Sequence, residues 1–338
     1  MNPLNQRRWQ AFKQHRRSYF SFWCFLLLFT VSLFSNLIAN NKPLLLSYQE
    51  ELYVPFLKTY PETTFGGELD IEPDWQDDYI QNQIEQSGGW ILSAPVPFSY
   101  DTINYNRPAP APPSSENYFG TDDQGRDVLA RVLYGLRTSI LFGLMLTLGT
   151  TLFGVSIGAV QGYYGGSVDL LGQRFLEVWS GLPVLYLLII LSGLIDSGFW
   201  SLLGILLLFS FVPLIDPVRA EFLKARNYDY VMAARAMGLG HARLMTRHIL
   251  PNALVATVTF LPFILCGAIG TLASLDFLGF GMPLGSPSLG ELIAQGKHNL
   301  QAPWLGITGF LTTSLLLILL VFIGEGVRDA LDPRNVNG

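Results

Sequence analysis

Six long apolar runs constrain this chain more than any other feature of its sequence. Each is long enough to cross a hydrocarbon core of about 30 Å at a rise of about 1.5 Å per helical residue. They cover residues 20–39, 139–162, 175–195, 198–215, 253–275 and 304–324, and Asp196-Ser-Gly198 predicts a tight hairpin between the third and fourth. Only 14% of the residues are charged, against about 25% in soluble domains. We therefore predict an all-α polytopic membrane protein with six transmembrane helices.

The first run is predicted to be an anchor that is retained in the protein. It spans about twenty residues without a small-residue cleavage pattern after it, whereas the apolar part of a signal peptide has about 7–15. Both cysteines, Cys24 and Cys266, lie within predicted spans. We expect them to pack in the helices, because their spacing is not that of a disulfide framework or a metal site.

Charge asymmetry predicts the orientation. Residues 1–19 hold five lysines and arginines and no acid, and the loop 219–250 holds six against two acids. Residues 40–117 hold three basic residues and twelve acids. Because lysine and arginine collect on the inner side of a membrane, both termini and the loop 219–250 are predicted to be cytoplasmic.

These patterns divide the chain into five parts. They are an amphipathic cytoplasmic segment (1–19), a first transmembrane helix (20–39), a periplasmic insertion (40–117), a transmembrane domain (118–330) containing the cytoplasmic loop 219–250, and a cytoplasmic tail (331–338). The insertion is acidic and has enough aromatic residues for a small folded cap. It ends at residues 107–113, a predicted stiff polyproline linker. A passive spacer and a docking site for a partner both remain open.

Glycines and charged residues in or near the spans are explained by helix packing and by anchoring at the membrane interface. Gly154, Gly158 and Gly162 fall on one helix face and allow close helix packing, either within the chain or against a second one. The few charges near the spans are predicted to anchor them at the interface. Residues 276–303 are rich in glycine and proline and either bend over a cavity or connect two helices.

The segment from Arg226 to Asn252 predicts an ordered structure between two spans. Asn227 or Asp229 can cap a helix, and Ala233 and Ala234 leave one face small. Gly238 can end that helix in a left-handed conformation. A second short basic helix is predicted over 241–249, with Pro251 in the first turn of the next span. The residues expected to make contact with a partner are Asn227, Asp229, Tyr230, Ala233, Ala234, Arg235, Gly238, Arg243, Arg247, Leu250 and Pro251.

This segment resembles the "EAA" loop of the permeases of ATP-binding-cassette (ABC) importers. That pattern is Glu-Ala-Ala, three residues, Gly, nine residues, then Ile-x-Leu-Pro. Here Ala233, Ala234, Gly238 and Leu250-Pro251 match it, and Met232 takes the place of the glutamate. An ion pair made by that glutamate in relatives is therefore absent from this chain.

Further stretches resemble the C-type permeases of dipeptide and oligopeptide importers. They are Phe119–Ser139, Gly162–Asp169, Asp276–Gly281 and Pro287–Gly290. The acidic insertion, Asn40–Leu44 and Ile323–Pro333 resemble one branch of these permeases, whose system also admits the peptide-nucleotide antibiotic microcin C. Several matches in order over some two hundred residues are a strong signal.

The resemblance implies a type I importer fold in a bacterial inner membrane, acting as half of a peptide pathway. A homologous permease, an ATPase with two nucleotide-binding domains and a periplasmic peptide-binding protein are the implied partners, together with the lipid bilayer and no nucleic acid. The chain lacks a phosphate-binding loop with its lysine. We therefore expect no cofactor in this chain, with ATP and Mg²⁺ held by the ATPase, and no enzyme activity of its own.

A secondary transporter and a membrane enzyme are the alternatives to an importer subunit. A secondary transporter would call for ionisable groups in mid-span or an inverted repeat, and neither is evident. A membrane enzyme would call for clustered acids or histidines. His15, His241, His248 and His298 are dispersed, without metal-ligand spacing. The sequence does not identify residues that bind the substrate.

Overall fold

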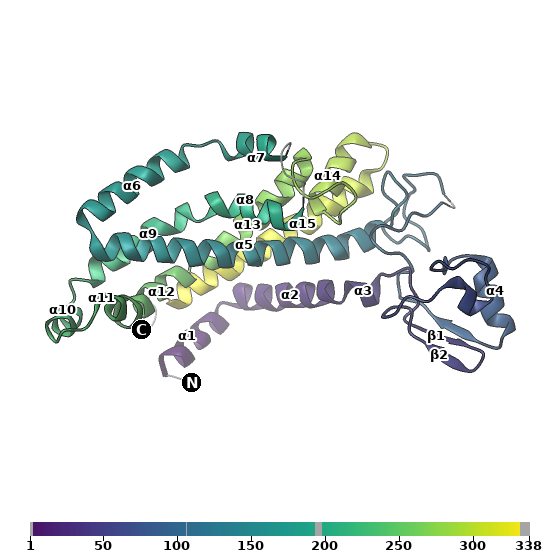
Figure 1. Cartoon of the computed structure of the whole chain (residues 1–338), viewed down its shortest axis with the longest axis horizontal. Helices are drawn as coiled ribbons and strands as arrows, with labels where there is room; N and C mark the ends of the chain where they lie inside the picture. Colours follow the sequence, from purple (N-terminus) through teal and green to yellow (C-terminus); the bar gives the residue numbers. More distant parts are fainter. Residues whose placement is uncertain (1–2, 106, 193–197, 332–338) are drawn as a thin grey trace. The chain divides into compact units, whose positions relative to one another are not determined.

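The structure is a computed structural model that describes residues 3–105, 107–192 and 198–331. It is mainly helical (Figure 1). The helices are α1 (Pro3–Gln14), α2 (Arg16–Leu33), α3 (Ser35–Ile38), η1 (Glu62–Phe65), α4 (Asp78–Gln86), α5 (Val128–Tyr164), α6 (Gly166–Ser180), α7 (Val184–Ser192), α8 (Phe199–Ser210), α9 (Val212–Ala225), α10 (Asp229–Ala236), α11 (His241–Arg243), η2 (Leu244–Ile249), α12 (Leu250–Val258), α13 (Leu261–Leu278), α14 (Leu289–His298) and α15 (Pro303–Leu331). The strands are β1 (Leu45–Tyr48), β2 (Glu51–Tyr53) and β3 (Trp90–Leu92).

The chain forms two compact units. Unit 1 comprises residues 1–27, 139–283 and 313–338, and unit 2 comprises residues 28–138 and 284–312. Helices α2, α5 and α15 contribute residues to both. The predicted hairpin at Asp196-Ser-Gly198 falls largely on residues 193–197, and the predicted tail on 332–338; these lie outside the described residues.

The described helices include fewer clear spans than the six predicted. Three of them, α5, α13 and α15, are long and apolar enough to cross a membrane, and the number rises to five if the bent pairs α6–α7 and α8–α9 each form one span. The pairs bend by 66° and 43°. Pro183 is the last residue of the first break and Pro213 is the second residue of α9, and a proline cannot donate the backbone hydrogen bond that continues the preceding helix. The first predicted run, 20–39, is divided between α2 and α3, and α2 begins with two arginines.

Helix α5 starts eleven residues earlier than the predicted run, at Val128 rather than at Ser139. Two arginines, Arg131 and Arg137, concealed this part of the helix in the hydropathy pattern. Arg131 is fully buried among acidic partners, so its charge does not end the helix.

The three glycines predicted to pack lie against α9 within unit 1. A Cβ atom on Gly154 would lie 2.9 Å from the Cβ of Leu214, and one on Gly158 would lie 2.7 Å from the carbonyl oxygen of Ile215. On Gly162 the nearest atom would be the carbonyl oxygen of Arg219, at 2.4 Å. These contacts are intrachain packing, and they hold α5 and α9 closer than any larger residue would allow.

The insertion is folded within unit 2. Strand β1 pairs antiparallel with β2 and with β3, giving the order β2-β1-β3. Gln49 and Glu50, both with positive φ, form the tight turn between β1 and β2, as two-residue hairpins require. The sheet and α4 enclose Leu46, Tyr48, Phe65, Trp75, Ile80 and Ile84. The proline-rich segment after it is fastened at Ala111, whose amide donates to Thr121 Oγ1 at 2.8 Å.

Candidate coupling site

The predicted motif folds into a compact helical elbow in unit 1, here called the knob (residues 227–249). Helix α10 ends before Gly238, which has φ +84°. The amide of Gly238 donates to the carbonyl of Arg235 at 3.0 Å, and that of Leu239 donates to the carbonyl of Ala234 at 3.2 Å. This pair of bonds is a Schellman motif, which needs a residue tolerant of the left-handed region. Gly238 therefore ends the helix as expected.

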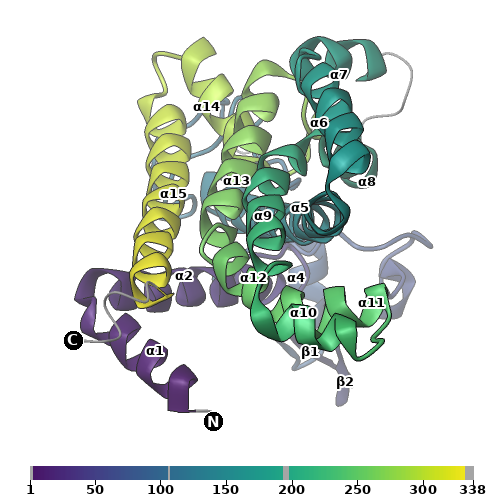
Figure 2. The same cartoon turned by 90° about the vertical axis from the view of Figure 1, so that its left-hand side faces the viewer.

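The second half of the knob differs from the plain helix predicted over 241–249. Helix α11 covers only one turn, and Leu244–Ile249 form a π-helical turn before α12 begins. Figure 2 shows α10 and α11 beside the adjoining ends of α9 and α12. Pro251 is the second residue of α12, directly after the π turn, and a proline donates no backbone hydrogen bond to the turn before it. Isolated π turns are rare and occur often at functional sites.

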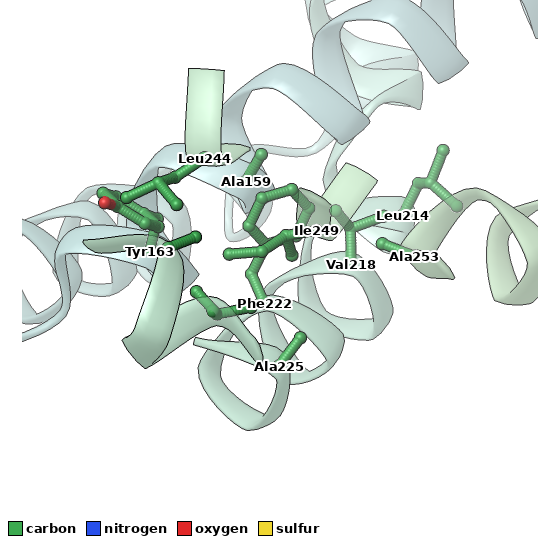
Figure 3. Packing of buried hydrophobic residues seen from close by; sticks show 11 residues of the cluster. Ala159, Tyr163, Leu214, Val218, Phe222, Ala225, Leu244, Ile249 and Ala253 are labelled. Carbon is green, nitrogen blue, oxygen red and sulfur yellow. The ribbon is translucent and has the colours of Figure 1, made fainter. Parts of the chain in front are cut away.

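A hydrophobic core holds the knob to the rest of unit 1 (Figure 3). The inner face of the knob contributes four buried side chains, those of Val231, Ala234, Leu244 and Ile249. They pack with Phe222 in a cluster that also contains Ala159, Tyr163, Leu214, Val218, Ala225 and Ala253. The knob therefore shares one close-packed cluster with α5, α9 and α12.

Tyr163, near the end of α5, provides polar anchors for the knob. Its hydroxyl lies 2.8 Å from Nδ1 of His241, and its carbonyl accepts from Arg226 Nη1 at 3.3 Å. The guanidinium of Arg235 lies 5.5 Å from the centroid of its ring. A Cβ atom on the adjacent Gly165, whose φ is +63°, would lie 2.3 Å from Arg226 Nη1. A glycine is therefore needed where the arginine crosses the turn.

An ion pair ties the start of α6 to α9. Arg219 donates from Nη2 to Asp169 Oδ2 at 2.7 Å and from Nε to Oδ1 of the same carboxylate. Such two-pronged pairs fix orientation as well as distance. Residues 162–169 are therefore bonded to Arg219 and Arg226, in the segment that directly precedes the knob. The sequence marked this stretch only by family resemblance, because its partners lie 50 or more residues further along the chain.

The outer face of the knob is apolar and basic. The side chains of Tyr228, Tyr230, Met232 and Met237 are 37%, 44%, 50% and 74% exposed. Arg243 and Arg247 are also exposed. A helical surface with large exposed apolar side chains and flanking arginines has the composition of a protein interface.

The structure differs from the predicted details of α10 in two respects. Its N-cap residue is Tyr228, with no side-chain capping bond, so neither Asn227 nor Asp229 caps the helix. Asn227 instead donates to the carbonyl of Leu223 at 3.3 Å, and Asp229 occupies the first turn, where a carboxylate favours the helix dipole. Ala233 is exposed while Ala234 is buried, because consecutive helical residues point about 100° apart.

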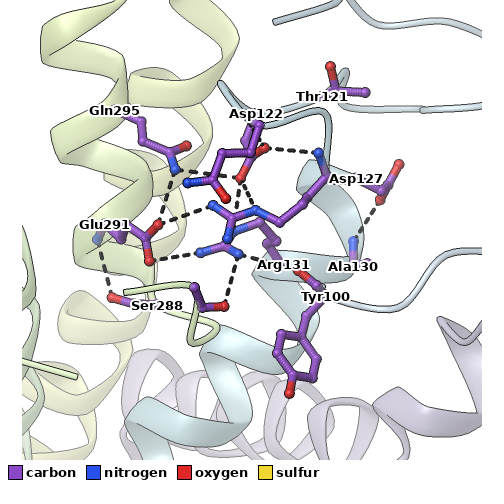
Figure 4. A network of polar contacts seen from close by, with 12 residues as sticks. Tyr100, Thr121, Asp122, Asp127, Ala130, Arg131, Ser288, Glu291 and Gln295 are labelled. Atoms are coloured by element: carbon purple, nitrogen blue, oxygen red, sulfur yellow. Dashed lines mark hydrogen bonds and ion pairs between the residues drawn. The ribbon is translucent and has the colours of Figure 1, made fainter. Parts of the chain in front are cut away.

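Unit 2 contains a second cluster, a buried network of charges (Figure 4). Asp122 Oδ2 accepts from Arg126 Nε at 2.6 Å, and Glu291 receives Arg126 Nη2 at 3.2 Å and Arg131 Nη2 at 2.9 Å. Arg131 also donates to the carbonyl of Ser286 at 3.0 Å. These bonds attach the glycine- and proline-rich loop and α14 to the start of α5.

Asp127 caps α5 beside this network. Its Oδ1 accepts from the amide of Ala130 at 2.8 Å, and its Oδ2 accepts from Asn117 Nδ2 at 2.8 Å. Burial raises the pKa of the Asp127 carboxyl, against the opposing effect of these hydrogen bonds. The residue is thus a fixed N-cap within a folded loop.

Unit 1 also contains a cavity of about 380 Å³ among the predicted spans. Its walls are Leu146, Thr150, Ser210, Pro213, Leu214, Phe260, Phe263, Ile264, Gly267, Ala268 and Thr271. Among the described residues, the buried hydroxyl of Thr150 has no hydrogen-bond partner. The sequence did not single out this threonine, because threonine is common in apolar helices.

Comparisons with known proteins agree with this architecture. Residues 154–337 match the family model "Binding-protein-dependent transport system inner membrane component". The chain is 58% identical to the inner membrane ABC transporter permease protein YejE of Escherichia coli, over 99% of this chain and 98% of that protein. It is 54% identical to the peptidoglycan transport system permease protein YejE of Agrobacterium fabrum, over 98% and 94%.

A dipeptide permease is a more distant relative. The dipeptide transport system permease protein DppC of Alkalihalophilus pseudofirmus is 34% identical over 66% of this chain and 73% of that protein. The similarity to DppC and to both YejE proteins identifies a membrane transport subunit rather than an enzyme. The chain belongs to the family of binding-protein-dependent inner membrane transport components, as an ABC peptide-importer permease related to YejE.

Proposed function

We propose that the knob is the surface through which this permease receives the movement of its ATPase. The observation that supports the proposal is its two-sided construction. Val231, Ala234, Leu244 and Ile249 bury the inner face in a core shared with α5, α9 and α12. The outer face exposes tyrosines, methionines and arginines. A push on the outer face is therefore transmitted to the helices that build the pathway.

The proposal includes the companion chains. A second, homologous permease completes the pathway as a heterodimer in a type I importer fold, with α2 and α3 as the first of six spans. An ATPase with two nucleotide-binding domains holds ATP and Mg²⁺, and a binding protein delivers the peptide. The termini and the knob lie in the cytoplasm and the insertion in the periplasm. The basic residues of segment 1–19 and of loop 219–250 support this orientation in the membrane.

The peptide path is proposed to pass the cavity of unit 1. Its walls are apolar except for a few hydroxyls, among which that of Thr150 has no partner within the described structure. A peptide bond offers both donors and acceptors in every residue, so the buried Thr150 hydroxyl can bind any peptide without reading its side chains once a rotamer change turns it towards the cavity. Two relatives are named for the transport of dipeptides and of peptidoglycan, and both of these cargoes contain peptide bonds. On the same basis we include microcin C, a peptide-nucleotide, as a cargo.

Co-purification followed by an ATPase assay tests the knob. The whole importer is prepared with wild-type permease, with Met232→Ser and Met237→Ser combined, and with Leu300→Ser as control. Leu300 is 82% exposed and lies outside the knob. About tenfold less ATPase should co-purify with the double variant. A loss of about 1.4 kcal/mol from apolar burial corresponds to a tenfold loss of affinity. Stimulation by peptide-loaded binding protein should fall with it, while the control keeps both.

Salt provides the second part of the test. Arg243→Gln or Arg247→Gln should weaken retention of the ATPase most at low ionic strength, because exposed charges are screened within about 10 Å at 0.1 M salt and about 3 Å at 1 M. Equal retention by all these variants, at every salt concentration, would place the ATPase contact elsewhere on the chain.

A further inference from the structure

Unit 1 contains an apolar groove beside the N-terminal helix. Its volume is about 500 Å³, which is within the range of ligand sites. It is lined by Arg8, Trp9, Phe12, Phe22, Pro251, Leu254, Val255, Val258, Ile323, Val327, Ala330 and Leu331. These residues come from α1, α2, α12 and α15. Figures 1 and 2 show α1 beside the end of α15 that carries its C-terminus.

The aromatic wall of the groove is built from interlocking rings. Trp9 stacks on Phe12 with centroids 5.7 Å apart, and both meet Phe22 edge-on. Gly326 of α15 lets this wall approach, because a Cβ there would lie 2.3 Å from the Cβ of Ser18 and 3.1 Å from the ring of Phe12. Helices α1 and α2 are therefore packed on α15 by shape, and the groove is a fixed feature of the unit.

Among the described residues that line the groove, one is charged, and it is basic. This residue is Arg8, and Arg7, Arg16 and Arg17 lie on the same two helices without an acidic residue among the first nineteen. Within the described part of the chain, none of these four arginines forms a salt bridge. An apolar slot with the guanidinium group of Arg8 in its lining fits a molecule with a long hydrocarbon chain and an anionic head.

We propose that this groove binds one anionic phospholipid, with an acyl chain against Val255, Val258 and Ile323 and the phosphate on Arg8. Each buried CH₂ adds to the affinity, so the acyl chain supplies affinity for any phospholipid. The arginine supplies the preference for an anionic head, since one basic residue near such a surface contributes a factor of about five in affinity. A bound lipid would clamp α1 to α12, the helix that directly follows the knob.

The test measures lipid retention by the intact importer. The complex is purified in detergent, stripped of lipid and titrated with phosphatidylglycerol or with phosphatidylethanolamine of the same acyl chains. Native mass spectrometry then gives the dissociation constant of the first lipid to bind. Arg8→Gln removes the charge at the groove. Arg7→Gln is its matched control, because it removes the same charge from an exposed neighbour outside the lining. Val255→Trp fills the groove.

The wild type and Arg7→Gln should bind phosphatidylglycerol about fivefold more tightly than phosphatidylethanolamine. Arg8→Gln should bind the two lipids equally, and Val255→Trp should lose the tight copy of both while keeping its ATPase. The proposal is overturned if the wild type does not prefer the anionic lipid, or if Arg7→Gln and Arg8→Gln behave alike. Absence of any tight copy from the wild-type complex would equally overturn the lipid assignment.

Discussion

Replacing Gly238 by alanine tests the geometry of the knob most directly. Gly238 has φ +84°, and a Cβ atom there would meet nothing within 4 Å. The cost of alanine is therefore a backbone cost alone, about 1–2 kcal/mol for an L-residue in the left-handed region. Gly240 is the matched control. It also has open space around its Cβ position, but its φ is −66°, so alanine there incurs no left-handed backbone cost.

Hydrogen exchange of the Leu239 amide measures this cost. That amide donates to the carbonyl of Ala234 across the Gly238 turn, so it exchanges when the turn opens. A loss of about 1–2 kcal/mol in local opening free energy should speed exchange about 5- to 30-fold in Gly238→Ala. Gly240→Ala should leave it unchanged. In the assembled importer, only Gly238→Ala should lower the ATPase rate stimulated by loaded binding protein.

Two results would refute this reasoning. Equal exchange at Leu239 in the two variants would mean that the left-handed turn does not hold the knob. Faster exchange in Gly238→Ala with undiminished stimulation would mean that the turn is folded as described but does not transmit the movement of the ATPase.

Three further predictions concern the two units. Arg131→Met should destabilise unit 2 by about 3–5 kcal/mol in denaturant unfolding, because it leaves the acids of a buried network unpaired, whereas the partly exposed Arg137→Met should cost about 1 kcal/mol; equal losses would contradict the network. Thr150→Val should raise stability by about 1–3 kcal/mol while slowing peptide import, because the hydroxyl is buried without a partner in the described structure. Thr257→Val should lose about 0.5–1.5 kcal/mol, since that hydroxyl donates to Ala253 at 3.0 Å; a loss in both would show that Thr150 is satisfied. Because burial raises the pKa of Asp127 in the folded state, wild-type stability relative to Asp127→Asn should increase as pH falls through that raised pKa towards the ordinary value of about 3.9; a relative decrease over this interval would contradict the assignment.

Local signals predicted much of the knob. The positive φ of Gly238 and the place of Pro251 follow from what glycine and proline do at helix ends, wherever the helix lies. The predicted cap at Asn227 or Asp229 is wrong because α10 begins directly after Tyr228, and the Asn227 side chain donates to the carbonyl of Leu223 instead. The π turn over 244–249 was not predictable, since it depends on how Leu244 and Ile249 reach a common core.

Long-range pairs set the limit of prediction. Glu291 lies 160 residues from Arg131, and Arg219 lies 50 from Asp169. Composition shows that such charges exist but not which of them meet. The start of α5 was placed too late for the same reason, because Arg131 looks like the end of an apolar run until its acidic partners are known.

The π turn has a mechanical consequence. A π turn closes each hydrogen-bonded ring with one residue more than an α turn, and the amide of Leu250 bonds to the carbonyl of Met245 in this way. The segment between α11 and α12 therefore contains one residue more than an α-helical turn would hold. Were that residue passed along the helix, everything beyond it would rotate by about 100° and advance about 1.5 Å. A push along the helix axis at this point would therefore both advance and rotate α12.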